Sequence, residues 1–255
     1  MKNKELIFEE IIKAKKYQDI DQGLINKIID EEFPKYQSNK LCIKAVKNKL
    51  HQIHEVFLSS KASNKAKEFL KENKYNEILK LHTSTLERLT FYHEFYQRIF
   101  DVTGVPDSII DIACGYNPFA ISYMNLPPGF KYYAYDINEA TNKLLKQFFK
   151  QNNYNGLSKT IDLTNNIPKD KCDMALVLKF LPIIEQQKKD FSLKLLKELN
   201  TNFIVVSFPT KTLTGKNVGM LSNYKSSFHE LIKNDFTVIK EIQFPNEMVF
   251  IIKKF

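Results

Sequence analysis

The second half of the sequence alternates between short strand-like runs and longer helical patterns, and this alternation restricts the fold more than any other feature. The strand-like runs lie at residues 108–113, 131–137, 157–163, 173–178 and 202–208. Helical patterns separate them, notably at 139–151 and 183–199. Because strands that alternate with helices build βαβ units, we expect an α/β fold whose parallel sheet is covered by helices on both faces.

The last segment departs from this alternation. Two strand-like runs at 237–242 and 247–253 are joined by only four residues, 243–246. So short a link cannot hold a crossover helix, so these strands are expected to pair antiparallel. The predicted architecture is a mostly parallel, seven-stranded, Rossmann-like sheet with an antiparallel C-terminal hairpin, as is typical of class I S-adenosylmethionine (SAM)-dependent methyltransferases.

The first hundred residues have helical periodicity. One amphipathic stripe runs from Ile20 to Phe33 and ends at Pro34, and a second covers residues 41–57. Shorter helices are expected at 62–72 and 75–81, and a capping box that begins at Ser84 opens a helix reaching Gly104. We therefore expect an N-terminal helical domain over residues 1–81 and a methyltransferase domain over residues 82–255.

The charge distribution favours an anionic partner. The net charge is +9, and only two of the 38 basic residues are Arg. Residues 35–81 contain 11 Lys and 4 Glu, a local excess of 7 positive charges. This excess predicts an RNA-phosphate surface on the helical domain, with Lys44 and Lys47 as candidate contacts. A codon preference for Lys and an ordinary solvated lysine face are alternative explanations.

Composition excludes several classes of protein. The 43% hydrophobic and 26% charged residues are those of a globular chain. No apolar run approaches the roughly 20 residues of a membrane span, and acids interrupt the N-terminal segment where a signal peptide would be apolar. Three widely separated cysteines favour reduced thiols and no Cys-rich zinc site. We expect a cytoplasmic protein without a metal or a membrane partner.

Small and acidic residues follow the predicted strands, where ligands bind in open α/β sheets. Ala113 and Gly115 allow the backbone to approach a ligand after the first strand. A carboxylate at Asp136 can accept both ribose hydroxyls, while Asp162 and Leu163 suit an adenine amino group and ring. Each aspartate alone could be a helix cap, but acids at successive strand ends favour a nucleoside site.

Several motifs together resemble one specific family, the aminoglycoside-resistance 16S rRNA (guanine-1405)-N7-methyltransferases of the Arm/Rmt/FmrO type. The motifs are residues 49–53 (KLHQI), 82–88 (HTSTLER), 111–118 (DIACGYNP), 133–136 (YAYD), 178–182 (LKFLP) and 207–216 (SFPTKTLTGK). The resemblance implies SAM as cofactor, S-adenosylhomocysteine as product, and the assembled 30S subunit as substrate. We expect the protein to be a monomer. It also implies resistance to aminoglycosides as the biological outcome.

The same resemblance implies roles for individual residues. Arg88 would pair with the methionyl carboxylate, although an exposed ion pair with Glu87 or Glu94 is the alternative reading. The remaining cofactor contacts implied are Phe57, His82, Thr83, Ser84, Leu178 and Gln187, besides the strand-end residues above. The remaining RNA contacts implied are Lys179, Lys211 and Lys216.

Guanine N7 carries a lone pair at neutral pH, so we expect no catalytic general base and predict that positioning supplies most of the acceleration. Phe180 or Phe208 is expected to hold the base. Two other functions remain open from the sequence: methylation of a different rRNA base, and a non-catalytic rRNA-binding assembly factor with the same fold.

Overall fold

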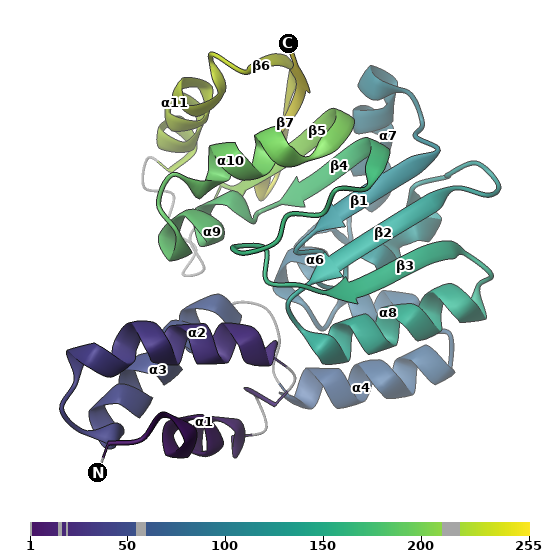
Figure 1. The fold of residues 1–255 in the computed structure, drawn as a ribbon. Helices are drawn as coiled ribbons and strands as arrows, with labels where there is room; N and C mark the ends of the chain where they lie inside the picture. Colours follow the sequence, from purple (N-terminus) through teal and green to yellow (C-terminus); the bar gives the residue numbers. More distant parts are fainter. Residues whose placement is uncertain (1, 15–16, 19, 55–59, 211–219) are drawn as a thin grey trace.

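The computed structural model describes residues 2–14, 17–18, 20–54, 60–210 and 220–255 of the chain (Figure 1). The helices before the sheet are α1 (Lys4–Ile12), α2 (Gln22–Glu32), α3 (Asn39–His54), α4 (Ser60–Lys71), α5 (Tyr75–Leu79), α6 (Thr83–Arg88) and α7 (Tyr92–Thr103). The helices that follow β1 in the chain are α8 (Glu139–Gln151), α9 (Leu181–Gln187), α10 (Phe191–Glu198) and α11 (Met220–Ile232). Two 3₁₀ helices are η2 (Phe33–Lys35), between α2 and α3, and η3 (Asn117–Tyr123), after β1. The strands are β1 (Ser108–Ile112), β2 (Lys131–Asp136), β3 (Asn155–Thr160), β4 (Lys171–Leu178), β5 (Asn200–Pro209), β6 (Phe236–Phe244) and β7 (Glu247–Lys254).

The strands form one seven-stranded sheet in the order β3-β2-β1-β4-β5-β7-β6. Strands β1 to β5 pair in parallel, while β7 pairs antiparallel with both β5 and β6. The expected α/β class and the antiparallel C-terminal hairpin are therefore confirmed. Because β7 lies between β5 and β6, its first residue, Glu247, pairs with Pro209 at the carboxyl end of β5.

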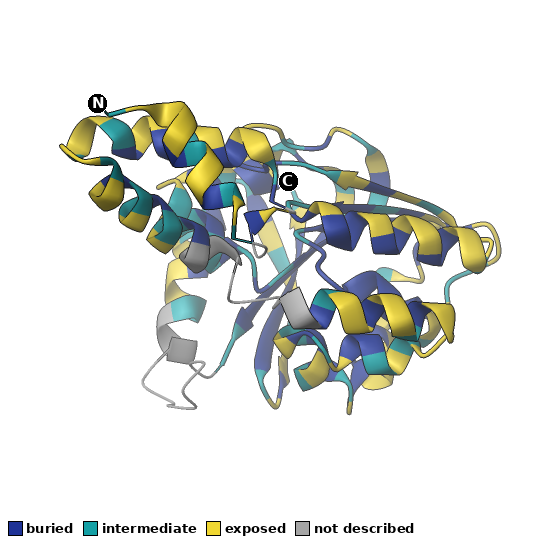
Figure 2. Cartoon of the chain, turned by 90° about the horizontal axis from the view of Figure 1, so that it is seen from below, coloured by how far each residue is buried: buried dark blue, intermediate teal, exposed yellow. Residues whose placement is uncertain are grey.

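Both faces of the sheet are buried, as expected for a parallel sheet. Successive strand residues point to opposite sides, so Ile109 belongs to one apolar cluster and Ile110 to the other. The first cluster includes side chains from α4, α5, α7, α8 and η3, and the second includes side chains from α9, α10 and α11. Figure 2 shows the buried strands between helices whose outward faces are exposed.

Helices α1, α2 and α3 form a separate layer with an apolar cluster of their own, which we call the helical layer. Ile7, Leu24 and Val46, one from each helix, are at most 3% exposed. The side chain of Asp21 caps α2 by accepting a hydrogen bond from the Leu24 N–H at 2.8 Å. In Figure 1 this layer lies below the carboxyl ends of the parallel strands.

Helices α4 and α5 pack with the sheet rather than with the helical layer. Ala66 and Leu70, four residues apart on α4, are fully buried in the same cluster as Ile78 of α5 and Ile109 of β1. Figure 1 shows α4 alongside α8. The apolar clusters therefore divide between α3 and α4, which differs from the domain boundary expected at residue 81.

Two expected helices are each divided in two. The helix expected from Ser84 to Gly104 breaks between α6 and α7, where the buried ring of Phe91 stacks on Phe244 with 5.3 Å between centroids. The pattern at 183–199 divides into α9 and α10 at Asp190, whose φ is +61°. Tertiary packing and a left-handed residue thus interrupt patterns that were continuous in sequence.

Candidate active site

A deep cleft opens at the carboxyl ends of the parallel strands, with an empty volume of about 940 Å³ that includes its open mouth. The structure brings ten of the twelve predicted cofactor-binding residues to its lining. They are His82, Ser84, Arg88, Ala113, Gly115, Asp136, Asp162, Leu163, Leu178 and Gln187. Thr83 is not among the lining residues, although its neighbours are, and Phe57 lies outside the described residues.

The loop after β1 lines the cleft with backbone. Ala113 and Gly115 have φ values of +52° and +51°, a left-handed conformation that is costly for a residue with a side chain. A Cβ atom on Gly115 would lie 3.1 Å from Nε2 of His82, so the site has little room for a side chain there. The Gly115 N–H donates to Oδ2 of Asp136 at 2.8 Å and so ties this loop to the end of β2.

Asp136 is held from both sides by backbone donors. The Asn138 N–H donates to its Oδ1 at 2.8 Å, opposite the bond from Gly115. Burial raises the pKa of Asp136, and these N–H groups oppose the rise. A carboxylate fixed in this way can still accept hydrogen bonds from a diol with its remaining lone pairs.

Asp162 organises the loop after β3. Its Oδ1 accepts from the N–H and the hydroxyl of Thr164, at 2.9 and 2.7 Å, and its Oδ2 accepts from Nδ2 of Asn165 at 2.6 Å. Strand β3 ends at Thr160, earlier than the sequence pattern suggested, so Asp162 and Leu163 belong to this loop. The self-bonded loop holds both residues against the cleft.

Arg88 forms a fully buried, bidentate ion pair with Glu247. Its Nε and Nη2 atoms donate to Oε2 and Oε1, both at 2.6 Å. Burial alone would raise the pKa of Glu247, but the charge and hydrogen bonds of Arg88 outweigh it and lower that pKa. The exposed pair with Glu87 or Glu94 considered from the sequence is therefore wrong, because Arg88 is only 1% exposed and its carboxylate partner comes from β7.

Lys179, which the resemblance implied as an RNA contact, lies in the wall of the cleft. It is 8% exposed and has a φ of +56°. Its Nζ contacts Oε2 of Glu87 at 2.5 Å and Oε2 of Glu247 at 3.8 Å. Two cations and two carboxylates, Arg88 and Lys179 with Glu87 and Glu247, thus compensate each other at this end of the cleft.

Two further lining groups have strongly shifted pKa values. Burial, followed by the charges of Arg88 and Lys179, lowers the pKa of His82 to about 3, so its ring is neutral at pH 7. Burial raises the pKa of Asp111 to about 6, against hydrogen bonds from Asn117 and Tyr132 at 2.9 and 2.7 Å. Sequence reasoning did not assign Asp111 to the site, although its place at the end of β1 was a usable signal.

Of the two aromatic candidates, Phe180 lines the cleft and Phe208 does not. The Phe208 ring is 5% exposed and packs against Tyr224, Phe228 and Phe250, with centroid distances of 5.1 to 5.8 Å. Phe208 was expected to be available to a base, and its place in the core makes that expectation wrong.

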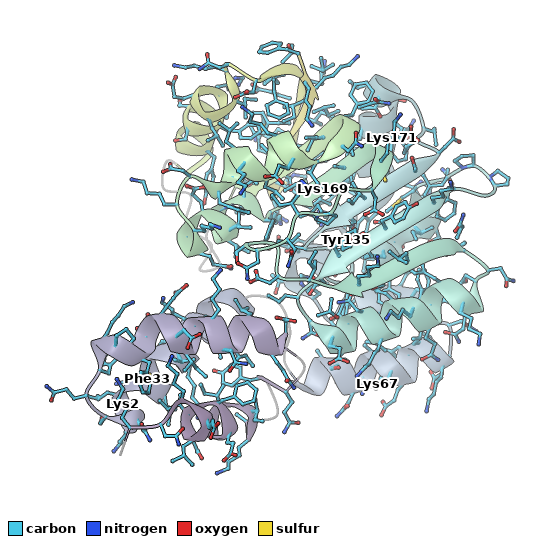
Figure 3. All side chains as sticks on the ribbon, viewed as in Figure 1. Lys2, Phe33, Lys67, Tyr135, Lys169 and Lys171 are labelled. Carbon is cyan, nitrogen blue, oxygen red and sulfur yellow. The ribbon has the colours of Figure 1, made fainter. Side chains whose placement is uncertain are left out.

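Among the other RNA-contact candidates, Lys44 is exposed and Lys47 is partly exposed on α3, while Lys211 and Lys216 lie outside the described residues. Lys67 projects from the outer side of α4 (Figure 3). Across the described part of the chain, His, Cys, Asp and Glu side chains form no group of three or more that could hold a metal ion. No described helix is long and apolar enough to cross a membrane.

The acidic strand ends and the compensated ion pairs leave the cleft suited to a cationic nucleoside, with hydrogen-bond acceptors for its hydroxyl and amino groups. These acceptors fit SAM, and a parallel sheet with β7 inserted antiparallel beside β5 is the fold of the SAM-dependent methyltransferases. The model of the family described as ribosomal RNA methyltransferase (FmrO) matches residues 13–251. The chain belongs to the FmrO family of ribosomal RNA methyltransferases.

Individual relatives agree with this assignment over nearly the whole chain. The 16S rRNA (guanine(1405)-N(7))-methyltransferase of Serratia marcescens is 28% identical, with 96% of each chain covered. The crystal structure of 16S rRNA methyltransferase RmtF in complex with S-adenosyl-L-homocysteine superposes with a TM-score of 0.91 at 28% identity, covering 100% of this chain and 99% of that one. The 16S rRNA methylase RmtB has a TM-score of 0.88 at 26% identity, with 100% of both chains covered.

Proposed function

We propose that this protein transfers a methyl group from SAM to N7 of guanine 1405 of 16S rRNA in the assembled 30S subunit. The observation that carries the proposal is similarity across the helical layer as well as the sheet, since RmtF matches all of this chain. A catalytic fold alone would leave the substrate open, whereas a shared substrate-binding layer favours a shared substrate. On this proposal the protein acts as a monomer in the cytoplasm and confers resistance to aminoglycosides.

In the proposed cofactor complex, the strand-end residues bind the nucleoside. Asp136 accepts hydrogen bonds from the ribose hydroxyls, Asp162 accepts from the adenine amino group, and Leu163 covers the adenine ring. Leu178 and Gln187 complete this end, and Ala113 and Gly115 present backbone to the ligand. His82, Thr83, Ser84, Arg88 and Phe57 are proposed at the methionine end, where Arg88 has already committed Nε and Nη2 to Glu247.

The electrostatics of the cleft suit a sulfonium ion. His82 is uncharged at neutral pH, since its pKa is about 3, and the cations Arg88 and Lys179 are compensated by carboxylates. Asp136 and Asp162 add negative charge at the nucleoside end. The protein therefore does not repel the positive charge of the methyl donor, which would otherwise cost binding free energy at close range.

Catalysis on this proposal depends on positioning. When bound, SAM supplies the methyl group from its sulfonium centre. Guanine N7 needs no deprotonation, so none of the titratable lining groups is required as a general base. The exposed part of Phe180 can pack against the guanine face, which orients N7 and accommodates the positive charge that the purine acquires.

The lysines of α3 and α4 are the proposed contacts for rRNA phosphates. Exposed lysines on these helices include Lys40, Lys44, Lys65, Lys67 and Lys71. By contrast, Lys35 and Lys49 pair with acids of α2, which reduces their charge available to RNA. Folded RNA is recognised mainly through its shape and backbone, and a distributed cationic surface suits that mode.

A methyl-transfer assay on purified 30S subunits tests the proposal. Tritiated SAM, the wild-type protein and 30S subunits are expected to give one methyl group per subunit, mapped to N7 of guanine 1405 by cleavage at 7-methylguanine. Asp136→Ala serves as the inactive control. A methyl group on another base would show that the target is different, and SAM binding without any transfer would favour an assembly factor.

Resistance provides an independent measurement in cells. Expression in a susceptible bacterium is expected to raise tolerance of kanamycin and gentamicin, and the Asp136→Ala variant is expected to abolish the effect at equal expression. Unchanged susceptibility with active wild-type protein would contradict the proposed outcome.

A further inference from the structure

The helical layer meets the sheet at the two loops that carry the nucleoside-binding carboxylates. The Asp21 N–H donates to the carbonyl of Ile137, the residue after Asp136, at 3.3 Å, and Ile20 forms an isolated antiparallel bridge with Asn138. From α2, Nζ of Lys27 contacts the loop after β3, which carries Asp162. These contacts of the helical layer thus lie beside residues that are proposed to bind the cofactor.

Lys27 makes two of these contacts with one ammonium group. Its Nζ donates to Oγ1 of Thr164 at 2.8 Å and to Oδ1 of Asn165 at 3.1 Å. Both acceptor side chains donate in turn to the Asp162 carboxylate, at 2.7 Å from Thr164 Oγ1 and 2.6 Å from Asn165 Nδ2. Lys27 therefore orients two of the groups that hold Asp162, although it is 137 residues away in sequence from Thr164.

Apolar packing does not fully join α2 to this region. A crevice separates them, with an empty volume of about 590 Å³ that includes open solvent. Leu24, Lys27 and Ile28 of α2 line one side, and Thr164, Ile183 and Gln187 line the other. Because Thr164, Ile183 and Gln187 also line the main cleft, a thin wall divides the two spaces. The hydrogen bond from Lys27 to Thr164 joins the two sides of this crevice.

We propose that Lys27 is a positioning residue that sets cofactor affinity by holding Asp162 from the helical layer. This inference rests on the proposed cofactor role of Asp162. The coupling is reciprocal. If bound cofactor raises the affinity for the ribosomal subunit by a given factor, then the bound subunit raises the affinity for the cofactor by the same factor. Binding of RNA by the helical layer is thereby coupled to binding of the methyl donor.

Titration calorimetry with S-adenosylhomocysteine tests the positioning role in the full-length protein. Lys27→Met is expected to raise the dissociation constant about 5- to 20-fold, because it removes the hydrogen bonds of a charged donor. Lys27→Arg keeps charge and donors and is expected to recover most of the affinity. Lys4→Met is the matched control, because it breaks the 2.7 Å contact of Lys4 with Asp30 of α2 without touching the loop.

Melting temperatures separate positioning from general destabilisation. Lys27→Met and Lys4→Met are expected to melt within about 3 °C of each other without ligand, as surface contacts contribute little to stability, while only Lys27→Met loses cofactor affinity. An unchanged dissociation constant for Lys27→Met, or an equal loss in Lys4→Met, overturns the inference.

Subunit binding tests the reciprocal effect. S-adenosylhomocysteine is expected to tighten binding of wild-type protein to 30S subunits, and Lys27→Met is expected to reduce that effect. No tightening in the wild type overturns the coupling. If the wild type binds S-adenosylhomocysteine yet methylates a base other than guanine 1405, the proposed target fails while the role of Lys27 stands.

Discussion

The guanidinium of Arg88 and the carboxylate of Glu247 join α6 to the first residue of β7 through two parallel contacts of 2.6 Å, with both side chains at most 2% exposed. A planar guanidinium and a carboxylate match in this geometry, which Lys could not reproduce. Arg88, which lines the cleft, is therefore held by a residue 159 positions away in the chain.

Glu247→Gln is expected to destabilise the fold by about 3 to 5 kcal/mol, because it leaves the buried Arg88 without a compensating charge. Urea unfolding followed by circular dichroism measures the change. Glu94→Gln is the control, since it breaks an exposed pair with Arg98 at 3.1 Å and is expected to cost at most about 0.5 kcal/mol. Equal effects for both variants would contradict a structural role for the buried pair.

Asp136→Asn is expected to weaken S-adenosylhomocysteine binding by about 30-fold or more, because an amide can accept through only one of its two terminal atoms. Titration calorimetry gives the dissociation constant. Asp170→Asn provides the control, because Asp170 accepts from the Tyr135 hydroxyl and is not among the cleft-lining residues. Similar losses in the two variants would indicate a general effect on β2 instead of lost ligand contacts.

Asp111 predicts a pH dependence of stability. Burial raises its pKa from 3.8 to about 6, so between these values the folded protein keeps a proton that the unfolded chain releases. The resulting stabilisation is present below about pH 4 and is lost as the pH rises through about 6. Between pH 4 and pH 7, the free energy of unfolding of Asp111→Asn is expected to rise by up to about 3 kcal/mol relative to that of the wild type.

Urea unfolding of both proteins at several pH values measures this difference, in which the titration of all other groups largely cancels. A difference that stays constant from pH 4 to pH 7 would contradict a raised pKa of Asp111.

The double variant Lys44→Glu, Lys47→Glu is expected to weaken binding to 30S subunits and to make the slope of log affinity against log salt concentration shallower, because fewer phosphate contacts remain. Filter binding at several salt concentrations measures both quantities. The double variant Lys240→Glu, Lys253→Glu, at exposed positions on β6 and β7, is the control with the same change in net charge. Loss of S-adenosylhomocysteine affinity in the double variant would instead indicate damage to the fold.

Much of the architecture could be predicted from local patterns. Strand-like runs that alternate with helical patterns located the strands within a few residues. The short link at 243–246 was enough to predict the antiparallel hairpin. Asp136 and Asp162 could be assigned to the cleft because the carboxyl ends of parallel strands share one edge. These signals are carried by neighbouring residues, so a single sequence contains them.

Other features depend on contacts that the sequence does not show. Nothing near Arg88 indicates that Glu247 binds it, because β7 reaches this position only through its insertion between β5 and β6. Lys179 resembled any surface lysine until its left-handed backbone and its contact with Glu87 placed it in the wall. The sequence likewise does not show that α4 packs with α8 and the sheet instead of with the helical layer.

The position of β7 has a consequence for biosynthesis. As the chain leaves the ribosome, β5 and β6 are both available before their common neighbour exists, so their unpaired edges remain open to other chains until residues 247–254 emerge. The counter-charge for Arg88 arrives at the same late moment. Completion of the cleft therefore waits until β7 has emerged and Glu247 can pair with Arg88.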